Sequence, residues 1–163
     1  MSFIRRNNFQ GKSYAPGWFL AHEECTRVTK QMAQEGATTT DEGGKIVPMG
    51  TIYPAADATA IGIVYEDVDV TSGDMPGSVV TKGEVYEDRL PEAVATYSEA
   101  TVPAGGNPKE LGLYERSGSA GAYVYTLTTD TTAVESKTYY SYDGKNIAAA
   151  AKTALVAAGF KFV

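Results

Sequence analysis

The alternation of apolar and small or polar residues is clearest in residues 60–90, and this stretch organises the rest of the chain. Its first part places Ile61, Ile63 and Tyr65 at every second position, the period of a strand that buries one face. Its last part, SVVTKGEVY, is again rich in strand-forming residues, and Gly83 within it predicts a bulge or a close backbone approach. The sequence EDVDVTSGDMPG between them combines carboxylates with turn formers. We therefore predict two strands joined by an acidic turn.

The segments before this stretch give weaker patterns. Residues 26–34 fit either a strand or a short helix, and both interpretations remain open. Residues 36–44 are rich in glycine and threonine and predict a loop. Residues 45–54 contain two prolines, which restrict their short extended pieces to sheet edges or strand ends.

The C-terminal segment predicts a helix followed by a short strand. Residues 147–158 carry apolar side chains on one helical face, namely Ile147, Ala151, Ala154, Leu155 and Ala158. Residues 143–146 supply candidate N-cap side chains, and Gly159 stands where a left-handed residue often closes a helix. The alternation of Phe160 and Phe162 with a lysine predicts a terminal strand.

Two stretches of the chain resemble a known family. The order AIGI, EDVDVTSGD and VVTKGEVYEDRL in residues 60–90 resembles the head decoration proteins of tailed bacteriophages, the lambda-type capsid-stabilising family, and related phage head fibre proteins. The last sixteen residues, AAAAKTALVAAGFKFV, are similar to that family's closing helix and terminal strand. The resemblance covers under a third of the chain. It implies a mainly β body with one C-terminal helix, a homotrimer, and attachment to the major capsid protein on the outer surface of the phage head.

Residues 1–20 are predicted to form a capsid-binding arm. Residues 1–30 hold five basic and two acidic residues, whereas the whole chain of 163 residues has a net charge of −6. In the resembled family this segment adds a strand to the capsid protein, so backbone hydrogen bonds supply much of the affinity. The candidate capsid-binding side chains are its apolar ones: Phe3, Ile4, Phe9, Tyr14, Trp18 and Phe19.

Residues 96–142 are predicted to be an inserted β module within a body formed by residues 21–95 and 143–163. This segment contains seven of the eleven tyrosines and predicts strands near 111–116, 122–128 and 137–142. It is also similar to a small module that recurs in virion proteins of phages infecting Gram-positive hosts. Its tyrosines are either cross-strand packing pairs or a glycan-facing surface. The candidates for that surface are Tyr114, Tyr123, Tyr125, Tyr139 and Tyr140.

No residue combination in the sequence predicts an enzyme, a cofactor or a metal centre. The only histidine, His22, lacks the second histidine of a zinc-protease helix, and no nucleophile elbow or phosphate-binding loop is present. The acidic turn does not match an EF-hand, because Ser72 stands where the loop needs glycine and Ser78 where it needs its last carboxylate. The turn is therefore either solvated or an irregular Ca²⁺ site. The negative net charge argues against nucleic-acid binding, and no apolar run is long enough to span a membrane.

The sequence thus predicts a non-enzymatic virion protein, a head decoration protein that stabilises the capsid and is held by its arm. The alternative is a head fibre or adhesion module that binds host-surface glycans through the tyrosine-rich insertion.

Overall fold

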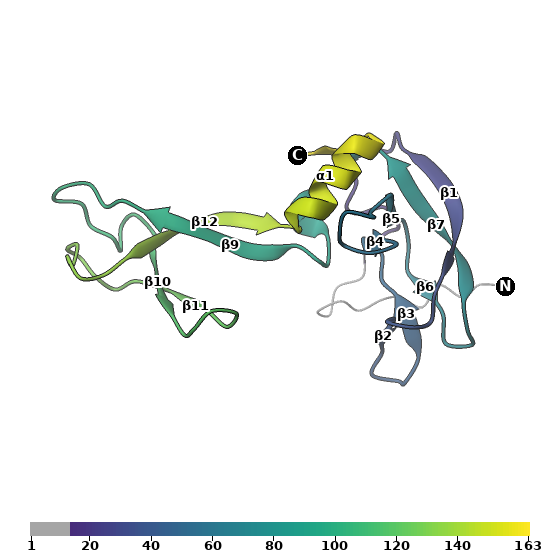
Figure 1. The fold of residues 1–163 in the computed structure, drawn as a ribbon, viewed down its shortest axis with the longest axis horizontal. Helices are drawn as coiled ribbons and strands as arrows, with labels where there is room; N and C mark the ends of the chain where they lie inside the picture. Colours follow the sequence, from purple (N-terminus) through teal and green to yellow (C-terminus); the bar gives the residue numbers. More distant parts are fainter. Residues whose placement is uncertain (1–13) are drawn as a thin grey trace. The chain divides into compact units, whose positions relative to one another are not determined.

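The computed structural model describes residues 14–163, and its fold is mainly β, as the sequence predicts (Figure 1). The chain forms two compact units. One contains the described residues up to Val94 together with Asn146–Val163, and the other is Ala95–Lys145. We refer to the first unit as the body and to the second as the module. The predicted insertion, residues 96–142, lies within the module.

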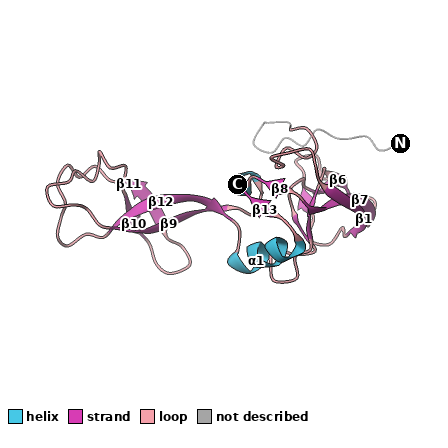
Figure 2. Ribbon diagram, turned by 90° about the horizontal axis from the view of Figure 1, so that it is seen from above, coloured by secondary structure: helices cyan, strands magenta, loops and turns pink. Residues whose placement is uncertain are grey.

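The described part of the body contains three sheets, one α-helix and a short 3-10 helix (Figure 2). The largest sheet has the order β1-β7-β5-β4 with antiparallel neighbours, and it consists of β1 (Thr26–Met32), β7 (Met75–Lys82), β5 (Gly62–Val64) and β4 (Ile52–Tyr53). A smaller sheet consists of β2 (Thr38–Thr39), β3 (Lys45–Val47) and β6 (Val68–Asp69). The third pairs β8 (Glu84–Val85) in parallel with β13 (Lys161–Phe162).

Both faces of β5 are covered, so its side chains do not follow the predicted alternation. In the register between β5 and β7, Ile63 faces Val80 and Val64 faces Val79. The first pair belongs to one core cluster and the second pair to another. By contrast, Ile61 is 43% exposed. The prediction of a single buried face beginning at Ile61 is therefore wrong, because a central strand with two covered faces buries consecutive residues.

The segments around β5 give the outcome of three further predictions. Residues 26–34, which fit a strand or a helix, begin with strand β1. Gly83 separates β7 from β8, and a Cβ there would lie 3.3 Å from the Cβ of Cys25, so a close approach exists as predicted. The predicted turn extends too far, because residues 75–77 already pair with β1 as the start of β7.

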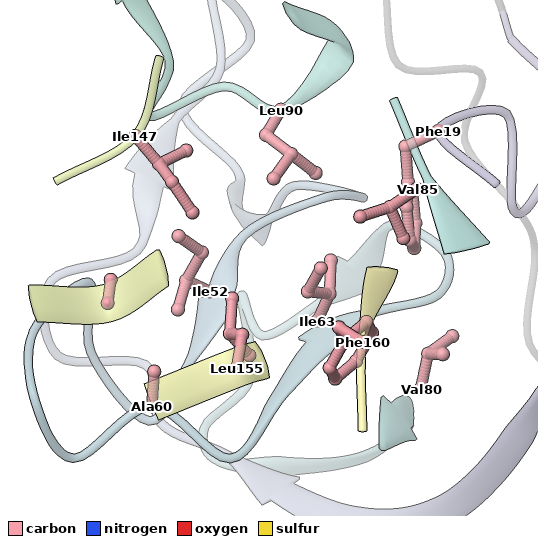
Figure 3. Packing of buried hydrophobic residues seen from close by; sticks show 11 residues of the cluster. Phe19, Ile52, Ala60, Ile63, Val80, Val85, Leu90, Ile147, Leu155 and Phe160 are labelled. Atoms are coloured by element: carbon pink, nitrogen blue, oxygen red, sulfur yellow. The ribbon is translucent and has the colours of Figure 1, made fainter. Parts of the chain in front are cut away.

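The helix α1 (Ala149–Ala158) closes the larger core cluster, which also contains Phe19, Ile52, Ala60, Ile63, Val80, Val85, Leu90 and Ile147 (Figure 3). Ala151 and Leu155 are fully buried, and Phe160 follows them into the core. Gly159 between helix and strand has φ 113°, the left-handed conformation that the sequence predicts. No helix in residues 14–163 is long and apolar enough to cross a membrane.

The N-terminus of α1 is not held by the predicted cap. Residues 143–146 belong to strand β12, and Ala148 at the N-cap position has no side-chain hydrogen bond. Instead, Glu87 of the 3-10 helix Glu87–Arg89 accepts a hydrogen bond from the backbone N–H of Ile147 at 3.0 Å. The same carboxylate pairs with the ammonium group of Lys152. A buried carboxylate far away in the sequence therefore holds the residue before the helix and a side chain of its second turn, without capping the N–H groups of the helix itself.

The module is built on one sheet of order β11-β10-β12-β9. Its strands are β9 (Val94–Ala100), β10 (Tyr114–Ser117), β11 (Val124–Leu127) and β12 (Tyr139–Asn146). The three predicted strands correspond to β10, β11 and β12 with shifted ends. The sequence does not predict β9, because its residues are mainly small or polar.

Candidate functional site

Five tyrosines of the module, which we call the tyrosine cluster, make direct ring contacts: Tyr97, Tyr114, Tyr125, Tyr140 and Tyr142. The rings of Tyr97 and Tyr125 are stacked, with centroids 3.9 Å apart and an interplanar angle of 7°. Tyr114 meets Tyr97 edge to face at 5.1 Å, and Tyr142 is tilted against it at 5.5 Å. Because β9 and β11 are the two outer strands, the stacked pair joins both edges of the sheet. Desolvation, followed by the neighbouring tyrosines, raises the pKa of Tyr97.

The five candidate glycan-facing tyrosines differ in accessibility. Tyr123 is 43% exposed, and Tyr114 and Tyr125 are half-buried. Tyr139 and Tyr140 are only 3% and 4% exposed. The assignment of these last two residues to a glycan-facing surface is therefore wrong, because their rings form the small core of the module. Sequence reasoning also omits Tyr142 from that surface, although it is 47% exposed.

Tyr139 is buried because its hydroxyl belongs to a set of polar contacts that we call the polar network. The hydroxyl donates to Asp130 Oδ2 at 2.7 Å and accepts from the backbone of Val134 at 3.1 Å. Lys137 Nζ lies 2.8 Å from Asp130 Oδ2 and 3.1 Å from Glu115 Oε2. The hydrogen bond from Lys137 lowers the pKa of Asp130, and the same contact raises the pKa of Lys137. The network thus ties the loop before β12 to strand β10.

Arg116 is the functional candidate of the module that sequence reasoning misses. Its guanidinium lies 4.3 Å from the ring centroid of Tyr123 and 4.8 Å from that of Tyr140. The residue is exposed, and within residues 14–163 it forms no ion pair with a carboxylate. The available signal is its position two residues after Tyr114, which places both side chains on the same side of a strand.

At the other candidate site, the structure corrects the extent of the arm. Phe19 is 1% exposed and lies in the larger core cluster of the body. Its backbone carbonyl accepts a hydrogen bond from Tyr86 N at 2.8 Å, and Leu20 forms a β-bridge with Val85. The assignment of Phe19 as a capsid-binding side chain is wrong for this structure, because the ring packs inside the body.

Arg89 holds the residues just before Phe19. Its guanidinium lies 4.6 Å from the Trp18 ring and 3.9 Å from the Tyr86 ring, and its Nη1 donates to the Trp18 carbonyl at 2.9 Å. Tyr14 stacks on Trp18 with centroids 3.9 Å apart. Residues 17–20 are therefore part of the body, and the predicted arm of residues 1–20 extends too far. The remaining candidates, Phe3, Ile4 and Phe9, lie outside the described residues.

The carboxylates of the acidic turn accept hydrogen bonds from the backbone. Asp67 accepts from Met49 N at 2.7 Å, Asp69 from Thr71 N at 2.9 Å, and Asp74 from Gln34 N at 2.8 Å. The described residues contain no group of three side chains placed to hold a metal ion. The geometry of the turn therefore gives the proposed Ca²⁺ site no support.

The body also has an open groove of about 590 Å³ between the ends of β7, β8 and β13, lined by His22, Glu24, Cys25, Thr26, Lys82, Gly83, Glu84, Gly159 and Lys161. His22 Nε2 lies 3.1 Å from Glu84 Oε2, and Lys161 Nζ lies 3.5 Å from Glu84 Oε1. The His22 side chain is 69% exposed, so this pair lies in solvent. We assign no chemistry to this groove.

Comparison of the chain with protein-family models, curated proteins and solved structures gives no significant match in any of the three.

Proposed function

We propose that this chain is a virion structural protein that decorates the outside of a phage head and stabilises the capsid. The observation that carries the proposal is the position of β8. This short strand pairs with the C-terminal strand β13, and its Val85 bridges to Leu20. Leu20 is thus paired with the body, which gives the proposed capsid-binding arm a fixed point of attachment.

The binding role of the arm follows from its charge and its tether. The segment before the anchor is basic, whereas the chain as a whole has a net charge of −6. An extended segment that adds a strand to the major capsid protein gains backbone hydrogen bonds, and its apolar residues provide anchors. Because Phe19 is packed in the core of the body, only the residues that precede it are available to contact the capsid protein.

Deletion of residues 1–13 tests this role. We expect the thermal stability of the truncated protein to stay the same, because Phe19 and Trp18 keep their contacts. Co-sedimentation with heads of the phage that encodes the chain should show binding at least about 100-fold weaker, since each lost hydrogen bond is worth ~1 kcal/mol. The double variant Arg5→Gln/Arg6→Gln separates charge from strand addition and should lose less. Full-length affinity in the truncated protein would refute the proposal.

We also propose that the chain forms a homotrimer, as the resemblance implies. The body exposes apolar side chains that a subunit interface would cover, among them Ile61, Val156 and Val163 at 43%, 52% and 62%. Light scattering at micromolar concentration should give three times the monomer mass of 17.3 kDa. A monomer mass in solution, together with binding to heads as single subunits, would contradict this assembly.

A second candidate function is adhesion to host-surface glycans through the module. It is favoured by the exposure of Tyr123 and Tyr142 beside the tyrosine cluster, since aromatic rings with one wet edge suit ligands that are partly apolar. A glycan array probed with the whole chain should give signals that the double variant Tyr123→Ala/Tyr142→Ala loses. Equal signals from both proteins would count against it, whatever the outcome of the head-binding experiment.

A further inference from the structure

We infer that the module binds anionic carbohydrate, and that Arg116 is the residue that recognises its carboxylate or phosphate group. This inference rests on the second candidate function and names the ligand class and the selecting residue. The occupant is identified by the chemistry of the surface: one oriented, unpaired cation next to exposed tyrosine rings.

Arg116 is held by three tyrosines and keeps hydrogen-bond donors for a ligand. Its guanidinium carbon lies 4.3 and 4.8 Å from the ring centroids of Tyr123 and Tyr140, and its side chain hydrogen-bonds to Tyr125. A guanidinium has five N–H groups around one plane, so the hydrogen bond to Tyr125 leaves another edge of the plane available. A carboxylate or a phosphate can accept two parallel hydrogen bonds from such an edge. The side chain is therefore oriented before a ligand arrives, which lowers the entropy cost of binding.

The strand register keeps acidic side chains away from this cation. Neighbouring residues on a strand point to opposite faces, so Glu115 lies on the face opposite Arg116. There Glu115 pairs with Lys137 and accepts from the hydroxyl of Thr128. Opposite Arg116 on β11 stands Tyr125, a neutral residue of the tyrosine cluster. The polar network thus holds Glu115 on the other face, and Arg116 forms no ion pair with a carboxylate among residues 14–163.

The ring of Tyr123 beside Arg116 favours a carbohydrate over a simple anion. Tyr123 is 43% exposed and combines a flat apolar face with a polar hydroxyl. A sugar ring likewise has an apolar face and a polar edge, so it can lie on a tyrosine while its acidic group reaches the arginine. Nucleic acid fits less well, because a chain of net charge −6 with one free cation on this face cannot neutralise several phosphates.

Isothermal titration of the full chain with three probes tests the inference: an oligogalacturonate, its fully methyl-esterified neutral form, and a poly(glycerol phosphate). The oligogalacturonate should bind. The neutral ester, which lacks the charge, and the poly(glycerol phosphate), which lacks a sugar ring, should each bind at least about tenfold more weakly. Arg116→Gln should weaken binding of the oligogalacturonate at least about tenfold, and Arg116→Lys nearly as much, because lysine lacks the planar fork. Lys109→Gln removes one positive charge elsewhere in the module and should change binding by less than about twofold.

The outcomes separate this inference from the functions on which it rests. Equal binding of the ester and the acid overturns the role of Arg116 and leaves glycan binding in place. An equal loss in Lys109→Gln and Arg116→Gln overturns it too, since attraction would then be non-specific. If none of the three probes binds, the inference fails, and the glycan array decides the second candidate function separately. Near-UV circular dichroism of Arg116→Gln must match that of the parent, and Tyr123→Ala, which keeps the arginine, should also weaken binding.

Discussion

The body and the module are stabilised in different ways, although both are small and mainly β. In the body, side chains from distant parts of the sequence meet in two apolar clusters, and Ile63, Val80 and Leu155 are 0% exposed. In the module, the most buried large side chains are Tyr139 and Tyr140, and these contact the polar network and Arg116. One unit thus depends on apolar burial and the other on aromatic and polar contacts.

This difference accounts for where apolar surface is left exposed. A four-stranded sheet without a covering layer cannot bury both of its faces. Leu127 and Val124 of β11 are therefore 57% and 58% exposed, and Tyr142 is 47% exposed. The module keeps its rings accessible because its polar network contributes to stability. The apolar side chains exposed on the body, such as Ile61 and Val163, are instead the ones that we expect a subunit interface to cover.

The largest expected effect of a single substitution is in the body. Phe19→Ala should lower the free energy of unfolding by about 3–5 kcal/mol, the usual cost of emptying a buried phenylalanine site. Urea denaturation measures this change. Leu111→Ala in the module serves as the control and should cost less than about 0.5 kcal/mol, since Leu111 is 52% exposed. Unchanged stability in Phe19→Ala would mean that this residue belongs to a free arm after all.

Acid should act in opposite directions on two carboxylates, Asp130 in the module and Glu92 in the body. In the module, the folded-state pKa of Asp130 is lowered, chiefly by its hydrogen bond to Lys137. Its contribution to stability is therefore complete above the unfolded pKa and is lost as the pH falls through the folded value. In the body, burial raises the pKa of Glu92, which accepts from Ile52 N at 2.9 Å with one oxygen and has no partner for the other within the described chain. Its contribution is complete below the unfolded pKa and is lost as the pH rises through the folded value.

Amide hydrogen exchange followed from neutral pH down to about pH 3 can separate these effects, because the carboxylates titrate in that range. The loop tied by Asp130 should lose protection on acidification, and Asp130→Asn should show that loss already at neutral pH. Glu92→Gln should increase protection around Ile52 at neutral pH and remove its dependence on pH. A parallel response of both units to acid, unchanged in these two variants, would contradict the comparison.

A smaller effect is expected for the tyrosine cluster. Tyr97→Leu removes ring contacts with three tyrosines and should destabilise the module by about 1–2 kcal/mol, since aromatic pairs contribute ~0.5–1.5 kcal/mol beyond area burial. The body should be unaffected. Tyr123→Leu, whose ring contacts Arg116 and no other tyrosine, is the matched control and should cost less. Exchange rates in β9 and β11 report the difference, and equal losses in both variants would show that ring stacking adds little.

The smallest effect should follow from removal of the whole module. Joining Ala95 to Lys145 through a short Gly/Ser linker should change the free energy of unfolding of the body by about 1 kcal/mol or less, because loop length alters closure entropy only slowly. The module contributes no residue to either core cluster of the body. Circular dichroism showing an unfolded chain would mean that the module is part of the folding core.

Local sequence patterns predict much of this fold. The C-terminal helix, the left-handed Gly159 and the terminal strand are confirmed, because each depends on residues within a few positions of one another. Of the predicted apolar face, Ala151 and Leu155 are buried in the helix, whereas Ile147 lies before it and Ala158 is exposed. The mainly β character is confirmed for the same reason. The change in composition near residue 96 lies next to the unit boundary at Ala95. The tyrosine-rich strands are likewise recognisable from their β-forming residues, but the sequence does not predict which of the tyrosine rings are exposed.

Distant contacts decide the rest. Ile61 and Ile63 occupy equivalent positions in the alternating pattern, but only Ile63 packs in the core cluster that includes Val80 and residues of α1. In sequence, Phe19 looks like the other apolar residues of a basic terminal segment, but in the structure it packs in the same core cluster as Val85. Arg116 becomes a candidate binding residue only because the rings of Tyr123 and Tyr140 lie beside it. The sequence by itself determined the elements whose local pattern is strong, such as the C-terminal helix and the tyrosine-rich strands, since such a pattern depends on neighbouring residues. Which face of an element is covered, and therefore which side chains can bind a partner, depends on segments far apart in the chain that only the tertiary structure brings together.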